Sequence, residues 1–165
     1  MKGKELAIKY LSLRARSVWQ MKKYLIEKGQ NEEEVASIIQ ELVELGYLND
    51  EAYARDYILY GRSKNRGQIR IAKELDNKGI TREIIDSALG LVQAQEILED
   101  GKTYSERVRA EELALSWVEG VKIDEKVLRK VAGKLASLGY EVDTIYGIVG
   151  VLMAKGNEDN GSDQG

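Results

Sequence analysis

The residue types that most often carry out chemistry are missing from this chain, whose 165 residues include no histidine and no cysteine. Their absence excludes Ser-His-Asp and Cys-His catalysis, disulfide bonds, and metal sites with imidazole or thiolate ligands. Carboxylates remain as ligands for hard cations, but no acidic cluster has the alternating spacing of a calcium loop. A hydrolase built on two carboxylates stays open, with no residue pair to support it. We therefore expect no catalytic residue, no metal and no cofactor.

One tripeptide, Gly101-Lys102-Thr103, matches the end of a phosphate-binding loop. The full motif requires another glycine five residues before Gly101, where this chain has Glu96. The motif also follows a β-strand, and the sequence predicts none there. Nucleotide binding at this place is therefore not expected.

Basic residues form two stretches without any acid, at residues 6–26 and 57–73, although the formal net charge of the chain is -3. A shift of 50 residues superposes Arg16 on Arg66 and Lys23 on Lys73. A repeated basic patch favours an acidic or polyanionic partner, whereas a single charge run is typical of a solvated helix face. The candidate partner-binding residues are Arg14, Arg16, Lys22, Lys23, Arg62, Lys64, Arg66, Arg70 and Lys73.

Aromatic residues accompany these basic stretches. Tyr53, Tyr57 and Tyr60 share one face of a predicted helix. Their rings could stack on the bases of a single strand, but packing between helices is the favoured interpretation. The same interpretation is favoured for Trp19 and Trp117.

Three glycines mark an internal repeat in which Gly29, Gly79 and Gly139 each follow a leucine by four residues. Glycine commonly ends a helix in the left-handed conformation, where a Cβ atom would clash. In a Schellman turn, the residue that follows the glycine packs on the residue that lies four positions before the glycine. The expected apolar pairs are Leu75–Ile80, Leu135–Tyr140 and, around Gly46, Leu42–Tyr47.

Residues that cap helix N-termini follow these stops. The expected N-caps are Ser17 with Gln20, Asn31, Asn49 or Asp50, Thr81, Thr103 with Glu106, Asp124, and Glu141 or Asp143. Joining starts to stops predicts helices near residues 4–13, 17–28, 31–45, 50–63, 67–78, 81–98, 103–119, 124–138 and 142–154. No stretch has the period-two alternation of a strand, so the fold class is all-α.

The predicted helices group into three tandem three-helix modules, residues 1–48, 49–100 and 101–155. Residues 156–165 are polar and acidic, and they are expected to form a disordered tail. A module of ~50 residues is marginally stable alone, so neighbouring modules are expected to dock. No apolar run reaches the ~18 residues that span a membrane, and no signal peptide is recognisable, so a cytoplasmic location is expected.

Three segments together resemble one protein family. They are Gly46-Tyr47-Leu48-Asn49-Asp50-Glu51-Ala52-Tyr53-Ala54, then Gly67-x-Ile69-Arg70-Ile71-x-x-Glu74-Leu75-x-x-Lys78-Gly79-Ile80, and upstream Tyr10-Leu11-Ser12 with Arg14-x-x-Ser17. These segments are similar to the RecX family, regulators of the bacterial recombinase RecA. The similarity covers roughly residues 6–90, whereas residues 101–154 match only in helical rhythm.

The resemblance implies three helix-turn-helix-like modules in an elongated, curved arrangement. It also implies binding in the groove of the RecA filament on single-stranded DNA, with inhibition of ATP hydrolysis and recombination. It implies no enzymatic activity, and the family has no invariant catalytic residue to carry over. Gln20 replaces the family's usual glutamate, and glutamine can still serve in a capping box.

The alternative is a DNA-binding protein of tandem helix-turn-helix-like modules without a recombinase partner. The third helix of each module would then enter the major groove. In the first module that helix carries Glu32, Glu33 and Glu34 and no basic residue, so phosphates would repel it. Weak contact with single-stranded or double-stranded DNA stays open. We expect a monomer with no membrane partner.

Overall fold

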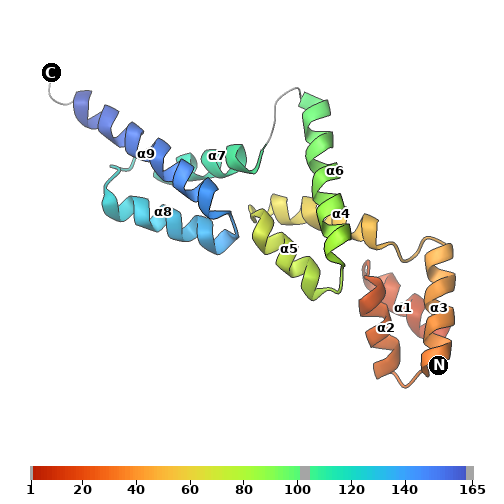
Figure 1. The fold of residues 1–165 in the computed structure, drawn as a ribbon. Helices are drawn as coiled ribbons and strands as arrows, with labels where there is room; N and C mark the ends of the chain where they lie inside the picture. Colours follow the sequence, from red (N-terminus) through yellow and green to blue (C-terminus); the bar gives the residue numbers. More distant parts are fainter. Residues whose placement is uncertain (1, 101–104, 163–165) are drawn as a thin grey trace. The chain divides into compact units, whose positions relative to one another are not determined.

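The computed structural model describes residues 2–100 and 105–162 of the chain. Every regular element in these residues is an α-helix, as the sequence predicts (Figure 1). The helices are α1 (Gly3–Leu13), α2 (Val18–Glu27), α3 (Glu32–Glu44), α4 (Asp50–Ser63), α5 (Gln68–Asn77), α6 (Arg82–Asp100), α7 (Glu106–Val118), α8 (Glu125–Leu138) and α9 (Val142–Ser162). None of these helices has the length and apolar character that crossing a membrane would require.

The chain divides into two compact units. The first consists of Met1–Ile58 and Lys73–Leu91, and the second of Leu59–Ala72 and Val92–Gly165. The division passes through α4, α5 and α6. Each unit therefore holds one complete three-helix group and part of the middle group.

Helices α1, α2 and α3 enclose a small core in the first unit. Its buried members are Ala7, Met21, Leu25, Val35, Leu42 and Leu48. Met21 and Leu25 are one turn apart on α2, and Val35 and Leu42 are two turns apart on α3. Each helix thus presents one apolar face to the others.

Helices α7, α8 and α9 enclose the core of the second unit. Its buried members are Ala110, Ala114, Val118, Val131, Leu135, Tyr140, Ile148 and Leu152. Alanines on α7 let the other two helices approach closely, and leucine and isoleucine fill the remaining space.

The predicted glycine stops are confirmed. Gly29, Gly79 and Gly139 have φ angles of +88°, +78° and +91°. At Gly79, the Ile80 amide donates to the Leu75 carbonyl at 3.2 Å, and both of these side chains are buried. At Gly139, the Tyr140 amide likewise donates to the Leu135 carbonyl, and both of these side chains are buried. The turns at Gly79 and Gly139 are therefore Schellman motifs closed by their predicted apolar pairs.

The turn at Gly46 departs from the prediction in its side chains. Its φ is +81°, and the Tyr47 amide donates to the Leu42 carbonyl at 2.8 Å, as expected. However, Tyr47 is 67% exposed, and Leu48 is buried in the core instead. The predicted Leu42–Tyr47 apolar pair is therefore wrong, because the chain leaves this turn with the next residue facing inward.

Five of the predicted N-caps form as expected, those at Ser17, Asn31, Asn49, Thr81 and Asp124. Ser17 and Gln20 make a reciprocal capping box at the start of α2. Asn31 accepts from the amide of Glu34 at 2.8 Å, and Asp124 caps α8 in the same way. These caps are local, because each joins residues three apart in the chain.

The start of α7 differs from the prediction. The predicted cap Thr103 lies outside the described residues. The Ser105 hydroxyl accepts from the Val108 amide at 3.3 Å, and the helix begins at Glu106. Serine and threonine are both good caps, so the sequence alone did not separate the two starts.

The carboxyl end also differs from the prediction of a disordered tail from residue 156. Helix α9 continues to Ser162. Gly156 is buried, and a Cβ atom there would lie 3.2 Å from Cβ of Ile123. Because glycine has no side chain, α9 passes close to Ile123 and remains helical beyond it.

Candidate partner-binding site

The nine predicted site residues are divided between the two units. The first unit holds Arg14, Arg16, Lys22, Lys23 and Lys73, and the second holds Arg62, Lys64, Arg66 and Arg70. Arg14, Lys22, Lys23, Lys64 and Lys73 are exposed, and Arg62, Arg66 and Arg70 are half-buried. The exposed members remain available for contact with a partner.

Arg16 is only 8% exposed. Its guanidinium carbon lies 3.7 Å from the ring centroid of Tyr10, and its Nε donates to the Tyr10 carbonyl at 3.4 Å. The other face of Tyr10 stacks on Tyr24, with ring centroids 3.9 Å apart and planes 8° apart. This cation–π contact removes Arg16 from the exposed part of the predicted patch.

The same arrangement recurs 50 residues later. The guanidinium of Arg66 lies 5.5 Å from the ring centroid of Tyr60, and the ammonium of Lys64 lies 5.9 Å from it. The repeated arginine is therefore explained in part by packing on a repeated tyrosine. The 50-residue spacing of Arg16 and Arg66 is visible in the sequence, and the same spacing separates Tyr10 from Tyr60.

In the first unit, the start of α2 meets the turn that ends α5. The Ser17 hydroxyl donates to the Lys78 carbonyl at 2.6 Å. The Val18 amide donates to Asp50 Oδ1 at 2.9 Å. A Cβ atom on Gly79 would lie 2.3 Å from Cβ of Trp19, so the tryptophan lies directly on the glycine backbone. We call this set of contacts the first docking contact.

In the second unit, the start of α5 meets the turn that ends α8 in the same manner. The Gly67 amide donates to the Leu138 carbonyl at 2.7 Å, and the Ile69 amide donates to the Gly139 carbonyl at 3.1 Å. The Gln68 amide donates to Glu106 Oε1 at 2.5 Å. This set of contacts is the second docking contact.

The two docking contacts use equivalent residues. Ser17 and Gly67 are 50 residues apart and each precedes the first residue of its helix. Asp50 is the first residue of α4, and Glu106 is the first residue of α7; each of these helices is the first of its three-helix group. The Asp50 carboxylate accepts from the Val18 amide, and the Glu106 carboxylate accepts from the Gln68 amide. The predicted docking of neighbouring modules thus has a repeated polar and glycine-based geometry.

Asp50 is therefore not the cap of α4. Asn49 fills that role, since its side chain accepts from the Ala52 amide at 3.0 Å. Burial raises the pKa of Asp50, although the Val18 amide opposes the shift. Burial likewise raises the pKa of Glu106, against the effect of the Gln68 amide.

Arg70 lies at the second docking contact. A Cβ atom on Gly139 would lie 2.3 Å from Cβ of Arg70. Arg70 was predicted to bind a partner, whereas its backbone and the base of its side chain pack on the turn that ends α8. Substitution of Arg70 would therefore change module docking as well as surface charge.

Tyr53 and Tyr57 of α4 pack within the protein, whereas Tyr60 is exposed. The Tyr53 and Tyr57 rings are stacked, with centroids 6.4 Å apart. The Tyr57 hydroxyl donates to the Glu74 carboxylate, and the Lys78 ammonium lies 5.1 Å from the Tyr57 ring centroid. These contacts agree with the packing interpretation rather than with a platform for bases.

The described ranges, 2–100 and 105–162, contain no group of three or more acidic side chains placed to hold a metal ion. Gly101-Lys102-Thr103 lies outside these ranges.

Comparison with known proteins identifies related chains. The sequence-family model described as RecX, first three-helix domain, matches residues 4–42, and that of the second three-helix domain matches residues 49–89. The chain is 29% identical to Regulatory protein RecX of Mycolicibacterium smegmatis, covering 94% of this chain and 82% of the relative. It is 31% identical to Regulatory protein RecX of Mycobacterium sp. (strain JLS), covering 89% and 79%.

A solved structure shows the same fold. The crystal structure of RecX from Lactobacillus salivarius superposes with a TM-score of 0.75 at 24% sequence identity, covering 92% of this chain and 95% of that one. The all-α arrangement of three-helix groups is therefore shared with that protein. With these sequence matches, the chain belongs to the RecX family of regulatory proteins.

Proposed function

We propose that this protein binds the filament of the recombinase RecA on single-stranded DNA and lowers its ATP hydrolysis and strand exchange. Membership of the RecX family supports a regulatory role. The exposed basic residues Arg14, Lys22, Lys23 and Lys73 of the first unit carry the proposal, because the chain as a whole is acidic. Exposed basic residues on an acidic chain favour an anionic or acidic partner surface.

The tandem groups favour binding to a repeating target. A second module binds at high effective concentration once the first is held, so several modest contacts add to a strong one. The docking contacts limit the freedom of neighbouring groups, and less entropy is then lost on binding. A ligand held along a filament slows any filament change that weakens its contacts.

The test measures binding to the RecA filament from the same organism, together with ATP hydrolysis and strand exchange. A triple variant, Arg14→Glu, Lys22→Glu and Lys23→Glu, reverses exposed charges. It should weaken binding more than ~10-fold at ~100 mM salt. Its melting temperature should stay near wild type, because exposed charges contribute little to folding.

A matched control reverses three exposed lysines of the other unit, Lys122→Glu, Lys126→Glu and Lys130→Glu. The change in formal charge is the same in both triple variants, so a general electrostatic effect would weaken the binding of both to the filament equally. Equal weakening would contradict a specific role for the first unit's patch. Full inhibition by the first triple variant would contradict the proposal itself.

A further inference from the structure

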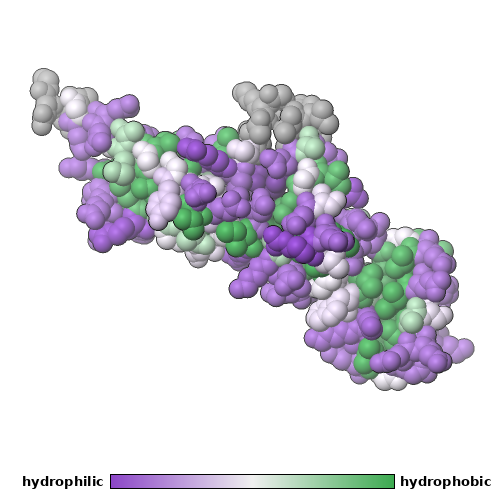
Figure 2. Space-filling model, in the orientation of Figure 1, coloured by the Kyte–Doolittle hydropathy of each residue, from purple (hydrophilic) through white to green (hydrophobic). Residues whose placement is uncertain are grey.

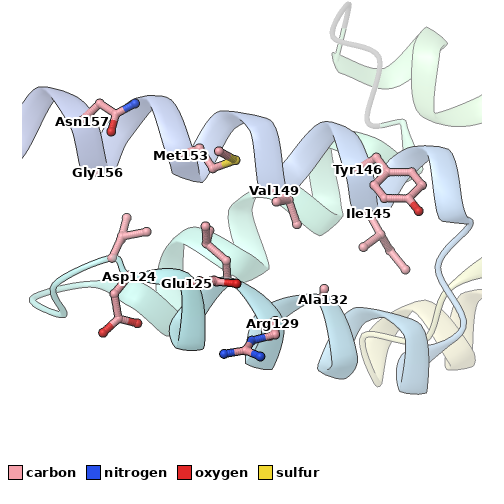
Figure 3. A pocket seen from close by; sticks show the side chains of 12 residues that line it. Asp124, Glu125, Arg129, Ala132, Ile145, Tyr146, Val149, Met153, Gly156 and Asn157 are labelled. Atoms are coloured by element: carbon pink, nitrogen blue, oxygen red, sulfur yellow. The ribbon is translucent and has the colours of Figure 1, made fainter.

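A groove of about 640 Å³ runs between α8 and α9. Figure 3 shows its two walls, with Ile145, Val149 and Met153 from α9 facing Glu125 and Ala132 from α8. Ile123 and Leu128 add further apolar surface. The groove lies entirely in the second unit, whereas Arg14, Lys22, Lys23 and Lys73 belong to the first.

The lining follows helical spacing on both walls. On α9 the residues at 145, 149, 153 and 156 are successive turns of one face, and on α8 the residues at 125, 128, 129 and 132 are too. From residue 145 to 156, α9 rises about 16 Å at ~1.5 Å per residue. The row on α8, from residue 125 to residue 132, rises about 10 Å. The two rows together form a seat for about two turns of another helix.

Large apolar side chains remain at the surface there. Tyr146 is 72% exposed and Met153 is 51% exposed. Figure 2 shows hydrophobic residues at the surface of this group, among hydrophilic ones. Methionine adapts its shape to a partner and is common at binding surfaces.

The groove is charged in a definite order. Asp124 and Glu125 lie at the end where α8 begins, and Asn157 lies on the opposite wall, on α9 (Figure 3). Arg129 follows one turn along the same wall, and the remaining lining toward Ile145 is apolar. A complementary ligand carries a basic residue at one end and an acidic residue one turn further on.

We propose that this groove binds an amphipathic helix of a partner protein. The helix carries apolar residues at i, i+3, i+4 and i+7, a basic residue facing Asp124 and Glu125, and an acidic residue facing Arg129. This interaction goes beyond the proposed function, because it uses neither the basic patch nor a recombinase filament.

The probe is a fluorescent, alanine-based peptide of roughly four helical turns with this pattern: leucines on one face, two lysines at one end and a glutamate one turn along. Fluorescence anisotropy measures its binding to the full-length protein, without recombinase or DNA. A peptide of the same composition with its leucines spread around the helix is the control. We expect saturable binding that is at least ~10-fold tighter than that of the control.

Two protein variants locate the site. Met153→Glu and Tyr146→Glu each place a charge in the groove at an exposed position, so folding should be retained. Each should weaken peptide binding about 10-fold or more. Circular dichroism verifies that both variants keep wild-type helicity and melting temperature.

A charge exchange tests the orientation. Replacing the peptide glutamate by lysine should weaken binding, and Arg129→Glu in the protein should restore it to within about 3-fold. Equal binding of the two leucine arrangements, or binding unchanged by both groove variants, would overturn the proposal. A dimer in sedimentation that Met153→Glu dissociates would overturn it too, because a second copy would then fill the groove.

Discussion

A Cβ atom on Gly67 would lie 2.4 Å from the carbonyl carbon of Gly139, so two glycine backbones meet where α5 begins and α8 ends. The distance leaves no room for any side chain at Gly67. It also lets the Gly67 amide reach the Leu138 carbonyl at 2.7 Å. The start of α5 thus packs directly on the turn that ends α8.

Gly67→Ala should therefore destabilise the protein. The methyl group would separate the two backbones and stretch the hydrogen bonds to Leu138 and Gly139, which contribute about 1 kcal/mol each. We expect a loss of about 1–3 kcal/mol and a lower melting temperature by circular dichroism. The control is Gly133→Ala on α8, where a Cβ meets nothing within 4 Å, and it should stabilise by up to ~1 kcal/mol. Similar effects from both variants would disprove the close contact.

Gly79→Ala should cost more than Gly29→Ala. Both glycines have a left-handed φ, so the backbone strain is similar. Only at Gly79 does the new Cβ meet another group, the Cβ of Trp19 at 2.3 Å. The additional loss should be about 1–3 kcal/mol in urea unfolding. Equal losses would mean that Trp19 does not lie on this turn in solution.

The carboxylate of Asp50 should make stability depend on pH. The pKa of Asp50 is raised in the folded state, chiefly by burial. The folded state is therefore favoured while the carboxyl is protonated, and this contribution to the free energy of unfolding is lost as the pH rises through the folded-state pKa. Asp50→Asn keeps an oxygen for the Val18 amide and removes this charge. Relative to wild type, the variant should gain stability between pH 3 and pH 7 in urea unfolding.

A companion variant separates charge from hydrogen bonding at this position. Asp50→Leu leaves the Val18 amide without its acceptor and should lose about 1–2 kcal/mol at both pH values. A pH-independent difference between Asp50→Asn and wild type would contradict the assignment of the burial effect.

Arg16 should contribute to folding more than Arg14 does. Arg16→Ala removes a buried guanidinium that lies on Tyr10 and should cost about 1–3 kcal/mol. Arg14 is exposed, and Arg14→Ala should stay within ~0.5 kcal/mol of wild type. Chemical unfolding compares the two. Equal effects would show that the cation–π contact adds nothing.

Local features of this fold followed from the sequence. A Schellman turn such as Leu75–Gly79–Ile80 joins residues within six positions, and the capping box of Ser17 and Gln20 joins residues three apart. Such hydrogen bonds depend on residue type and spacing, which the sequence contains. The all-α class and the helix ends predicted at the glycine turns are confirmed, whereas the start of α7 and the end of α9 differ from the prediction.

Tertiary structure decided what the repeated residues do. Gly67 meets Leu138 and Gly139 about seventy residues later, and no local spacing connects them. The sequence marked Arg16 as a surface charge and Asp50 as an alternative N-cap, yet the first lies on Tyr10 and the second bonds the Val18 amide. Burial and docking depend on which distant surfaces meet, and this depends on the packing of whole helices rather than on the residues nearby in the chain.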